Sequence, residues 1–90
     1  MNVSAALLDR AKATKGLTSD YKLAQALDWS VSFVSNLRTG QRVLTEDAAE
    51  ELATFADIDL VEVTALIRAE RAKTPTLRAA WAKIAEKRAA

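Results

Sequence analysis

Apolar residues recur every three or four positions along most of the chain, a spacing that predicts amphipathic helices rather than strands. No segment alternates apolar and polar residues with a period of two. The only glycines and proline are Gly16, Gly40 and Pro75, and each stands between two helical patterns. We therefore expect an all-α fold with six helices, at residues of about 4–15, 20–27, 31–39, 46–56, 60–72 and 75–88.

Residues that commonly cap helices support these boundaries. Ser19, Ser30 and Thr45 each precede a helical pattern, and a hydroxyl group at that position accepts a hydrogen bond from the first turn. Asp59 and Glu62 have the spacing of a capping box at the start of the fifth helix. In that helix we expect four apolar residues to face the core: Leu60, Val63, Leu66 and Ile67.

The sixth helix has an apolar stripe made of Leu77, Trp81 and Ile84. This stripe has two interpretations, which are compatible: it packs on the fifth helix of its own domain, at Leu60 and Ile67, or it forms the interface of a homodimer. We accordingly divide the chain into a compact five-helix domain, residues 1–72, and a C-terminal helix, residues 73–90, that serves as a packing or dimerisation extension of the same domain.

Composition and charge favour a binding protein over an enzyme. The 90 residues include no Cys and no His, which removes the thiol nucleophile, the commonest general base and the commonest metal ligands. The net charge of +1 hides an asymmetry: residues 1–44 carry six basic and three acidic side chains, residues 45–72 two and eight, and residues 73–90 five and one. We expect a binding protein without cofactor or metal, not an enzyme.

The third predicted helix has an unusual polar face. If Val34 and Leu37 point to the core, the opposite side holds small, uncharged polar residues, namely Ser32, Ser35, Asn36 and Thr39. A solvated face favours better helix formers such as Glu, Lys, Gln and Arg. Short side chains that donate and accept hydrogen bonds suit close approach to base edges in a DNA groove. Lys22, Arg38 and Arg42 flank this face and suit phosphate contacts.

The segment from residue 19 to residue 42 combines several features of one known motif: Leu23-Ala24, the cap Ser30, Val34-Ser35 and Arg38-Thr39-Gly40 before Arg42. It resembles the helix-turn-helix of the Cro/cI, or lambda-repressor-like, family of DNA-binding proteins, and the resemblance covers about residues 5–66. The tail, Glu70 to Pro75 followed by Arg78 to Trp81, is similar to that of short helix-turn-helix proteins encoded by phages, including filamentous ones.

The resemblance implies roles for individual residues. It implies that the third helix reads bases in the major groove through Val31, Ser32, Ser35 and Asn36. The residues expected to contact the DNA backbone are Ser19, Lys22, Arg38, Thr39 and Arg42. Two positions depart from the family pattern: Asp20 replaces a frequent Gln and would repel phosphate, and Asp28 replaces the usual Gly of the turn. Asp tolerates the left-handed conformation that such a turn requires.

The function that follows is a sequence-specific transcriptional regulator, a phage or prophage repressor that acts by occupying its operator. We expect it to bind double-stranded DNA at an inverted repeat as a homodimer, in the cytoplasm of a bacterial host, without a small-molecule ligand and without a membrane segment or signal peptide. The alternative is a helical protein-interaction module, such as an antitoxin-like or anti-repressor partner, that keeps the fold but has little DNA specificity.

Overall fold

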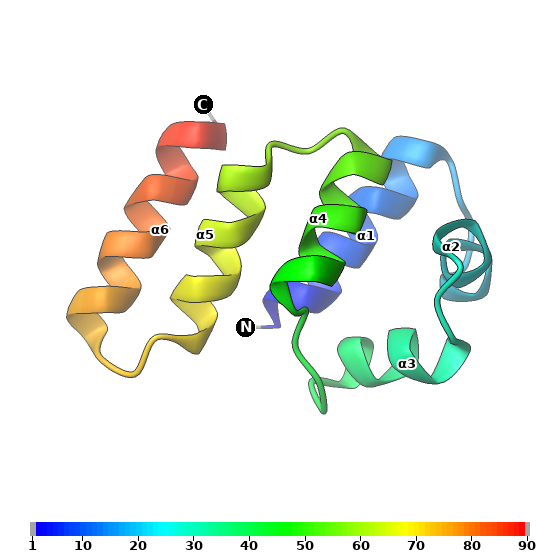
Figure 1. The fold of residues 1–90 in the computed structure, drawn as a ribbon, viewed down its shortest axis with the longest axis horizontal. Coiled ribbons are helices and arrows are strands. Elements are labelled where there is room, and N and C mark those ends of the chain that lie inside the picture. The colour runs from blue at the N-terminus through cyan, green and yellow to red at the C-terminus, as the bar shows by residue number, and fades with distance from the viewer. Residues whose placement is uncertain (1, 90) are drawn as a thin grey trace.

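Capping and breaker residues divide the chain into six α-helices, as the apolar pattern predicts. The computed structural model describes residues 2–89. The helices are α1 (Val3–Lys15), α2 (Asp20–Leu27), α3 (Val31–Thr39), α4 (Glu46–Ala56), α5 (Leu60–Arg71) and α6 (Pro75–Ala89), shown in Figure 1. Residues 2–89 contain no strand. The all-α fold class is thus confirmed, and each predicted boundary lies within one residue of the observed one.

The helix ends follow the predicted capping chemistry. The hydroxyl oxygens of Ser19, Ser30 and Thr45 accept hydrogen bonds from backbone N–H groups in the first turns of α2, α3 and α4. Gly16 and Gly40 adopt the left-handed conformation, with φ of 66° and 83°, and end α1 and α3. Local sequence is therefore sufficient to set where these helices begin and end.

The capping box at α5 forms only in part. The Glu62 N–H donates to Asp59 Oδ2 at 2.9 Å, as expected. The Glu62 carboxylate does not reach back to residue 59, because it is buried, at 7% exposure, and pairs with Arg10 of α1 at 2.8 Å. Glu62 thus links α5 to α1 rather than closing its own helix.

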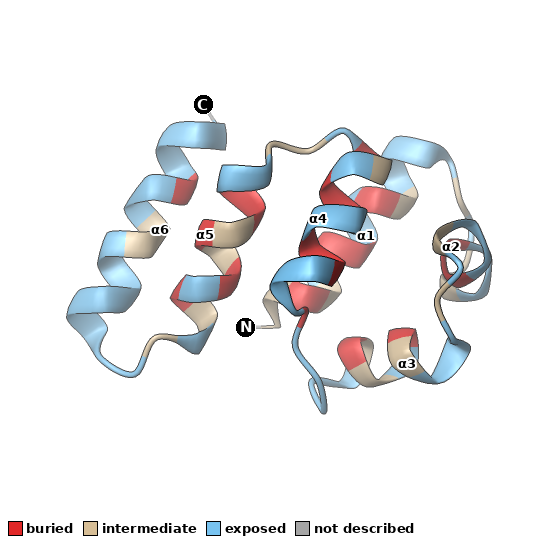
Figure 2. Ribbon diagram, viewed as in Figure 1, coloured by how far each residue is buried: buried red, intermediate tan, exposed pale blue. Residues whose placement is uncertain are grey.

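The core lies among α1 to α5, and α6 packs against α5 and no other helix (Figures 1 and 2). Leu7, Leu8, Leu23, Leu37 and Leu52 are among its largest buried side chains. The prediction for Leu60 is wrong: as the first residue of α5 it lies at the rim of the core and is 41% exposed. None of the described helices is both long and apolar enough to span a lipid bilayer.

The three residues of the apolar stripe of α6 differ in their exposure. Ala85 is the buried residue of α6, and Ala65 and Ala69 are buried on α5. Leu77 and Ile84 are 52% and 39% exposed. Trp81, the third residue of the stripe, is half-buried and lies under the Arg68 guanidinium of α5, 5.0 Å from the ring centroid. Packing of the stripe on Leu60 and Ile67 stays a prediction.

Residues at the start of α1 join it to the ends of two other helices. The Asn2 side chain accepts a hydrogen bond from the Ala5 N–H at 3.1 Å and donates to the carbonyl oxygens of Leu37 and Arg38 at 3.0 and 3.1 Å. The Val3 N–H donates to Glu70 Oε2 at 2.6 Å. Asn2 therefore caps α1 and α3 at once, and Glu70 of α5 caps α1 beside it.

Replacing Asp28 with glycine is expected to stabilise the fold slightly. Asp28 has φ 58° and ψ 38°, the left-handed conformation that a side chain disfavours. Ser30 caps α3, so Asp28 is not needed for that role. Because glycine also gains freedom in the unfolded chain, the net gain in the free energy of unfolding is at most about 1 kcal/mol. A urea melt measures it.

The matched change is Asp57→Gly, since Asp57 ends α4 in the same conformation with φ 54°. We expect the same sign of effect at both positions. Clear destabilisation by Asp28→Gly alone would show that the Asp28 carboxylate has a stabilising role of its own.

Candidate nucleic-acid interface

Helices α2 and α3 are joined by a short turn whose backbone hydrogen bonds are satisfied locally. The Asp28 N–H donates to the Gln25 carbonyl at 3.2 Å, and the Trp29 N–H donates to the Ala24 carbonyl at 2.9 Å. These two bonds are typical of a helix end with a left-handed residue. The turn therefore sends the chain directly from α2 into α3, as the helix-turn-helix prediction requires.

The outward face of α3 has the predicted composition. Ser32, Ser35 and Thr39 are exposed, Val31 is 54% exposed and Asn36 is half-buried, whereas Val34 and Leu37 are buried. Within residues 2–89 the side chains of Ser32, Ser35 and Asn36 make no hydrogen bond to protein, and Thr39 Oγ1 donates weakly to the Asn36 carbonyl at 3.4 Å. Three polar side chains on this face are thus available to a ligand.

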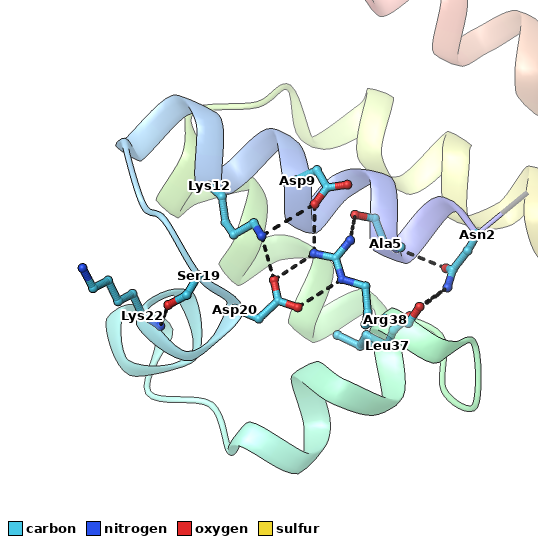
Figure 3. Close-up of polar contacts among 9 residues, drawn as sticks. All are labelled: Asn2, Ala5, Asp9, Lys12, Ser19, Asp20, Lys22, Leu37 and Arg38. Atoms are coloured by element: carbon cyan, nitrogen blue, oxygen red, sulfur yellow. Dashed lines mark hydrogen bonds and ion pairs between the residues drawn. The ribbon is translucent and has the colours of Figure 1, made fainter.

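Arg38 is not one of the available groups, although the sequence places it beside this face. Its guanidinium binds both carboxylate oxygens of Asp20, at 2.8 and 3.0 Å, and lies 2.9 Å from Asp9 (Figure 3). Lys12 also pairs with Asp20, at 3.0 Å. Arg38 therefore holds α3 against the start of α2 and the middle of α1.

The ion pairs explain the acid–base behaviour of this cluster. The Arg38 hydrogen bonds lower the pKa of Asp20 to about 2, with a further contribution from Lys12. Arg38 likewise lowers the pKa of Asp9, and the two carboxylates raise the pKa of the Arg38 guanidinium. The negative charge of Asp20, which by itself would repel a phosphate, is compensated by two cations.

The remaining residues expected at the DNA backbone differ in what they offer. The Ser19 hydroxyl oxygen caps α2 by accepting a hydrogen bond from the Lys22 N–H, so this oxygen is already engaged within the protein. The Lys22 side chain points away from the ion-pair cluster (Figure 3). Lys22 and Arg42 are exposed and form no salt bridge to residues 2–89. These two cations therefore suit the predicted phosphate contacts better than Arg38 does.

Two aromatic residues, Trp29 just before α3 and Phe33 within it, form a small cluster. The rings of Trp29 and Phe33 meet edge to face, with centroids 5.1 Å apart and planes at 79°. The Arg42 guanidinium lies over the Phe33 ring, 5.1 Å from its centroid, and Trp29 Nε1 donates to Glu51 Oε2 at 3.3 Å. Phe33 is half-buried against the core, and its contact with Arg42 is visible only in the structure.

Helix α6, which carries the residues predicted for a dimer interface, lies at the opposite end of the molecule from α3 (Figure 1). Leu77 and Ile84 are exposed, and the half-buried Trp81 is covered by the Arg68 guanidinium, 5.0 Å from the ring centroid. Leu60 and Val61 at the start of α5 are exposed as well. The α5–α6 pair thus presents apolar side chains to solvent.

A cavity of about 470 Å³ lies away from α3, between the start of α1 and the α5–α6 pair. It is lined by Val3, Leu66, Ala69, Glu70, Arg78 and Ala82. Reading of DNA uses a protruding helix rather than a cavity, so this hollow does not bear on the candidate interface.

Comparison with known proteins gives one match. The sequence profile of a family described as "Phage related protein" matches residues 64–90, which form most of α5 and all of α6 up to the last described residue. No curated protein and no solved structure gives a significant match. These comparisons do not confirm the Cro/cI family. What they support is that the C-terminal part of the chain, residues 64–90, is similar to a phage-related protein family.

Proposed function

We propose that this phage-related protein is a sequence-specific repressor that binds duplex DNA through the outward face of α3. One observation carries the proposal: a row of small, uncharged polar side chains is exposed on the second helix of a helix-turn-helix, and most of them have no partner within residues 2–89. A merely solvated helix has no need of such residues, because they are poor helix formers. A helix that enters the major groove does need them, because short polar side chains allow close approach to the base edges and hydrogen bonds with them.

The individual groups fit this use. The Asn36 side-chain amide has the donor and acceptor that match the edge of adenine. Ser32 and Ser35 can bond to several bases, and Val31 offers an apolar contact to a thymine methyl group. Lys22 and Arg42 supply positive charge beside this face, where phosphate oxygens of a bound duplex would lie.

The direct test is binding to DNA. Fluorescence anisotropy with duplexes from the region upstream of the gene, together with footprinting, should reveal one protected segment. Its affinity should fall steeply as the salt concentration rises, because phosphate contacts release counterions. Equal and weak binding to all duplexes would contradict sequence-specific recognition.

Asn36→Ala is expected to weaken binding to the cognate site by about 1–3 kcal/mol and to relax the preference at one base pair. The reason is the loss of a bidentate contact to one base. The control is Thr54→Ala, which removes an exposed polar side chain from α4, away from α3. Unchanged binding of Asn36→Ala to cognate and random duplexes would exclude base reading by this residue.

Assembly as a homodimer completes the proposal. A single reading helix contacts only a few base pairs, which discriminates poorly among the sites of a genome. Two copies related by a two-fold axis would read an inverted repeat, with half-sites about one helical turn apart. The exposed Leu77 and Ile84, with Trp81 beside them, supply an apolar surface for this contact. Occupation of the operator by such a dimer would block RNA polymerase.

The exposed apolar residues of α5 and α6 also favour a second candidate function, a protein-interaction module. The same surface would then bind a different protein, and the DNA contact would be weak and non-selective. A stable complex with another phage or host protein, combined with no preference among duplexes, would favour this alternative.

A further inference from the structure

We propose that Phe33 is a positioning residue for DNA binding: its ring holds the Arg42 guanidinium beside Asn36, where Arg42 donates to a backbone phosphate. This inference rests on the proposed function and adds a residue to it. Phe33 itself does not contact the DNA.

The Arg42 side chain is held in place by its neighbours and does not extend freely into solvent. Arg42 lies beyond Gly40, after the end of α3, and its charged group lies over the Phe33 ring at 5.1 Å. The Arg42 N–H also donates to the Asn36 carbonyl at 3.1 Å. Both the backbone and the side chain of Arg42 are therefore held next to α3.

Phe33 is in turn held from behind. Its ring meets Trp29 edge to face, and Trp29 is fixed to α4 through the hydrogen bond from its Nε1 to Glu51. Both aromatic residues are half-buried against the core. The series Glu51, Trp29, Phe33 and Arg42 thus connects the folded interior to one exposed cation.

The contact with the Phe33 ring leaves N–H donors of the arginine without a protein acceptor in residues 2–89. A guanidinium that lies on an aromatic face keeps its N–H donors in its own plane, where they match the oxygens of a phosphate. Arg42 forms no salt bridge to residues 2–89, unlike Arg38, whose donors are used by Asp9 and Asp20. A long side chain that is already ordered loses less conformational entropy when it binds.

The test is a double-mutant cycle on duplex binding with the full chain. Phe33→Leu keeps an apolar residue but removes the ring, and we expect it to weaken DNA binding about two- to fivefold, the range of an exposed cation–π contact. Arg42→Ala should weaken binding to all duplexes and lower the slope of affinity against salt by about one. In the Arg42→Ala background, Phe33→Leu should have no further effect on affinity.

Two further results separate positioning from a loss of structure. Phe33→Tyr keeps the ring and should keep the affinity, and urea melts should show each variant folded under the binding conditions. If Phe33→Leu weakens binding equally with and without Arg42, the positioning role is wrong while the proposed function stands. If Arg42→Ala leaves both affinity and salt slope unchanged, the phosphate contact itself is wrong.

Discussion

Replacing Arg38 with alanine is expected to lower the free energy of unfolding by about 1.5–3 kcal/mol, the range for hydrogen bonds to charged groups. The change removes the bonds to both oxygens of Asp20 and the ion pair with Asp9, and it leaves two carboxylates close together with only Lys12 beside them. The lower part of the range applies if solvent screens the cluster strongly, because the Arg38 and Asp20 side chains are 31% and 33% exposed.

The destabilisation should depend on pH with a definite sign. Arg38 lowers the pKa of Asp20 in the folded protein from its ordinary value of 3.8 to about 2. A lowered pKa contributes stability that is fully present above the unfolded value and is lost as the pH falls through the folded value. The difference between the wild type and Arg38→Ala should therefore be largest above a pH of about 4 and shrink toward a pH of about 2.

Urea melts of the two proteins at several pH values measure this effect. The control is Lys22→Ala, which removes an exposed cation without a salt bridge in residues 2–89 and should change stability by no more than about 0.5 kcal/mol. Arg38→Lys keeps the charge but loses the two-pronged contact, so its stability should be intermediate. Equal stabilities for Arg38→Ala and Lys22→Ala would show that the cluster contributes nothing to the fold.

Introducing a carboxylate on the exposed flank of α6, by Leu77→Asp, is expected to reduce affinity for an inverted-repeat operator by about a hundredfold or more. The reason is that a dimer binds its second half-site at a high effective concentration, an advantage that separate protomers lose. Leu77 is 52% exposed in the single chain, so the substitution should leave the fold intact. Light scattering should show the variant as a monomer at concentrations where the wild type is a dimer.

Two controls make the dimer test specific. Thr76→Asp adds the same charge at the neighbouring exposed position, which points about 100° away around the helix. Affinity for an isolated half-site should be the same for Leu77→Asp and the wild type, because α3 is untouched. A wild type that stays monomeric both free and on DNA would rule out the homodimer.

The sequence is sufficient to predict the helices but not the side-chain pairs that join them. Ser30 and Gly40 mark the ends of α3 because capping is a local interaction. Glu62 shows the limit: its spacing from Asp59 indicates a capping box, yet Arg10, 52 residues away, takes its carboxylate. Packing of α1 on α5 decides that contact, and no local pattern encodes it.

The candidate site divides in the same way. The exposure of Ser32 and Ser35 follows from helical periodicity once Val34 and Leu37 are assigned to the core. The role of Arg38 does not follow from periodicity, because its partners Asp9 and Asp20 belong to two other helices. One signal in the sequence points to this role. Asp20 stands where the resemblance leads one to expect Gln, and an acidic group at that position calls for a nearby cation such as Arg38.

The packing of α6 against α5 alone has an evolutionary consequence. Substitutions on the exposed flank of α6 leave α1 to α4 undisturbed, because no other helix rests on it. Selection can therefore alter what the C-terminal helix recognises while the α2–α3 surface keeps its own specificity. On the proposed function, this separation lets related phages diversify the surface for assembly while the DNA site that α3 recognises stays the same.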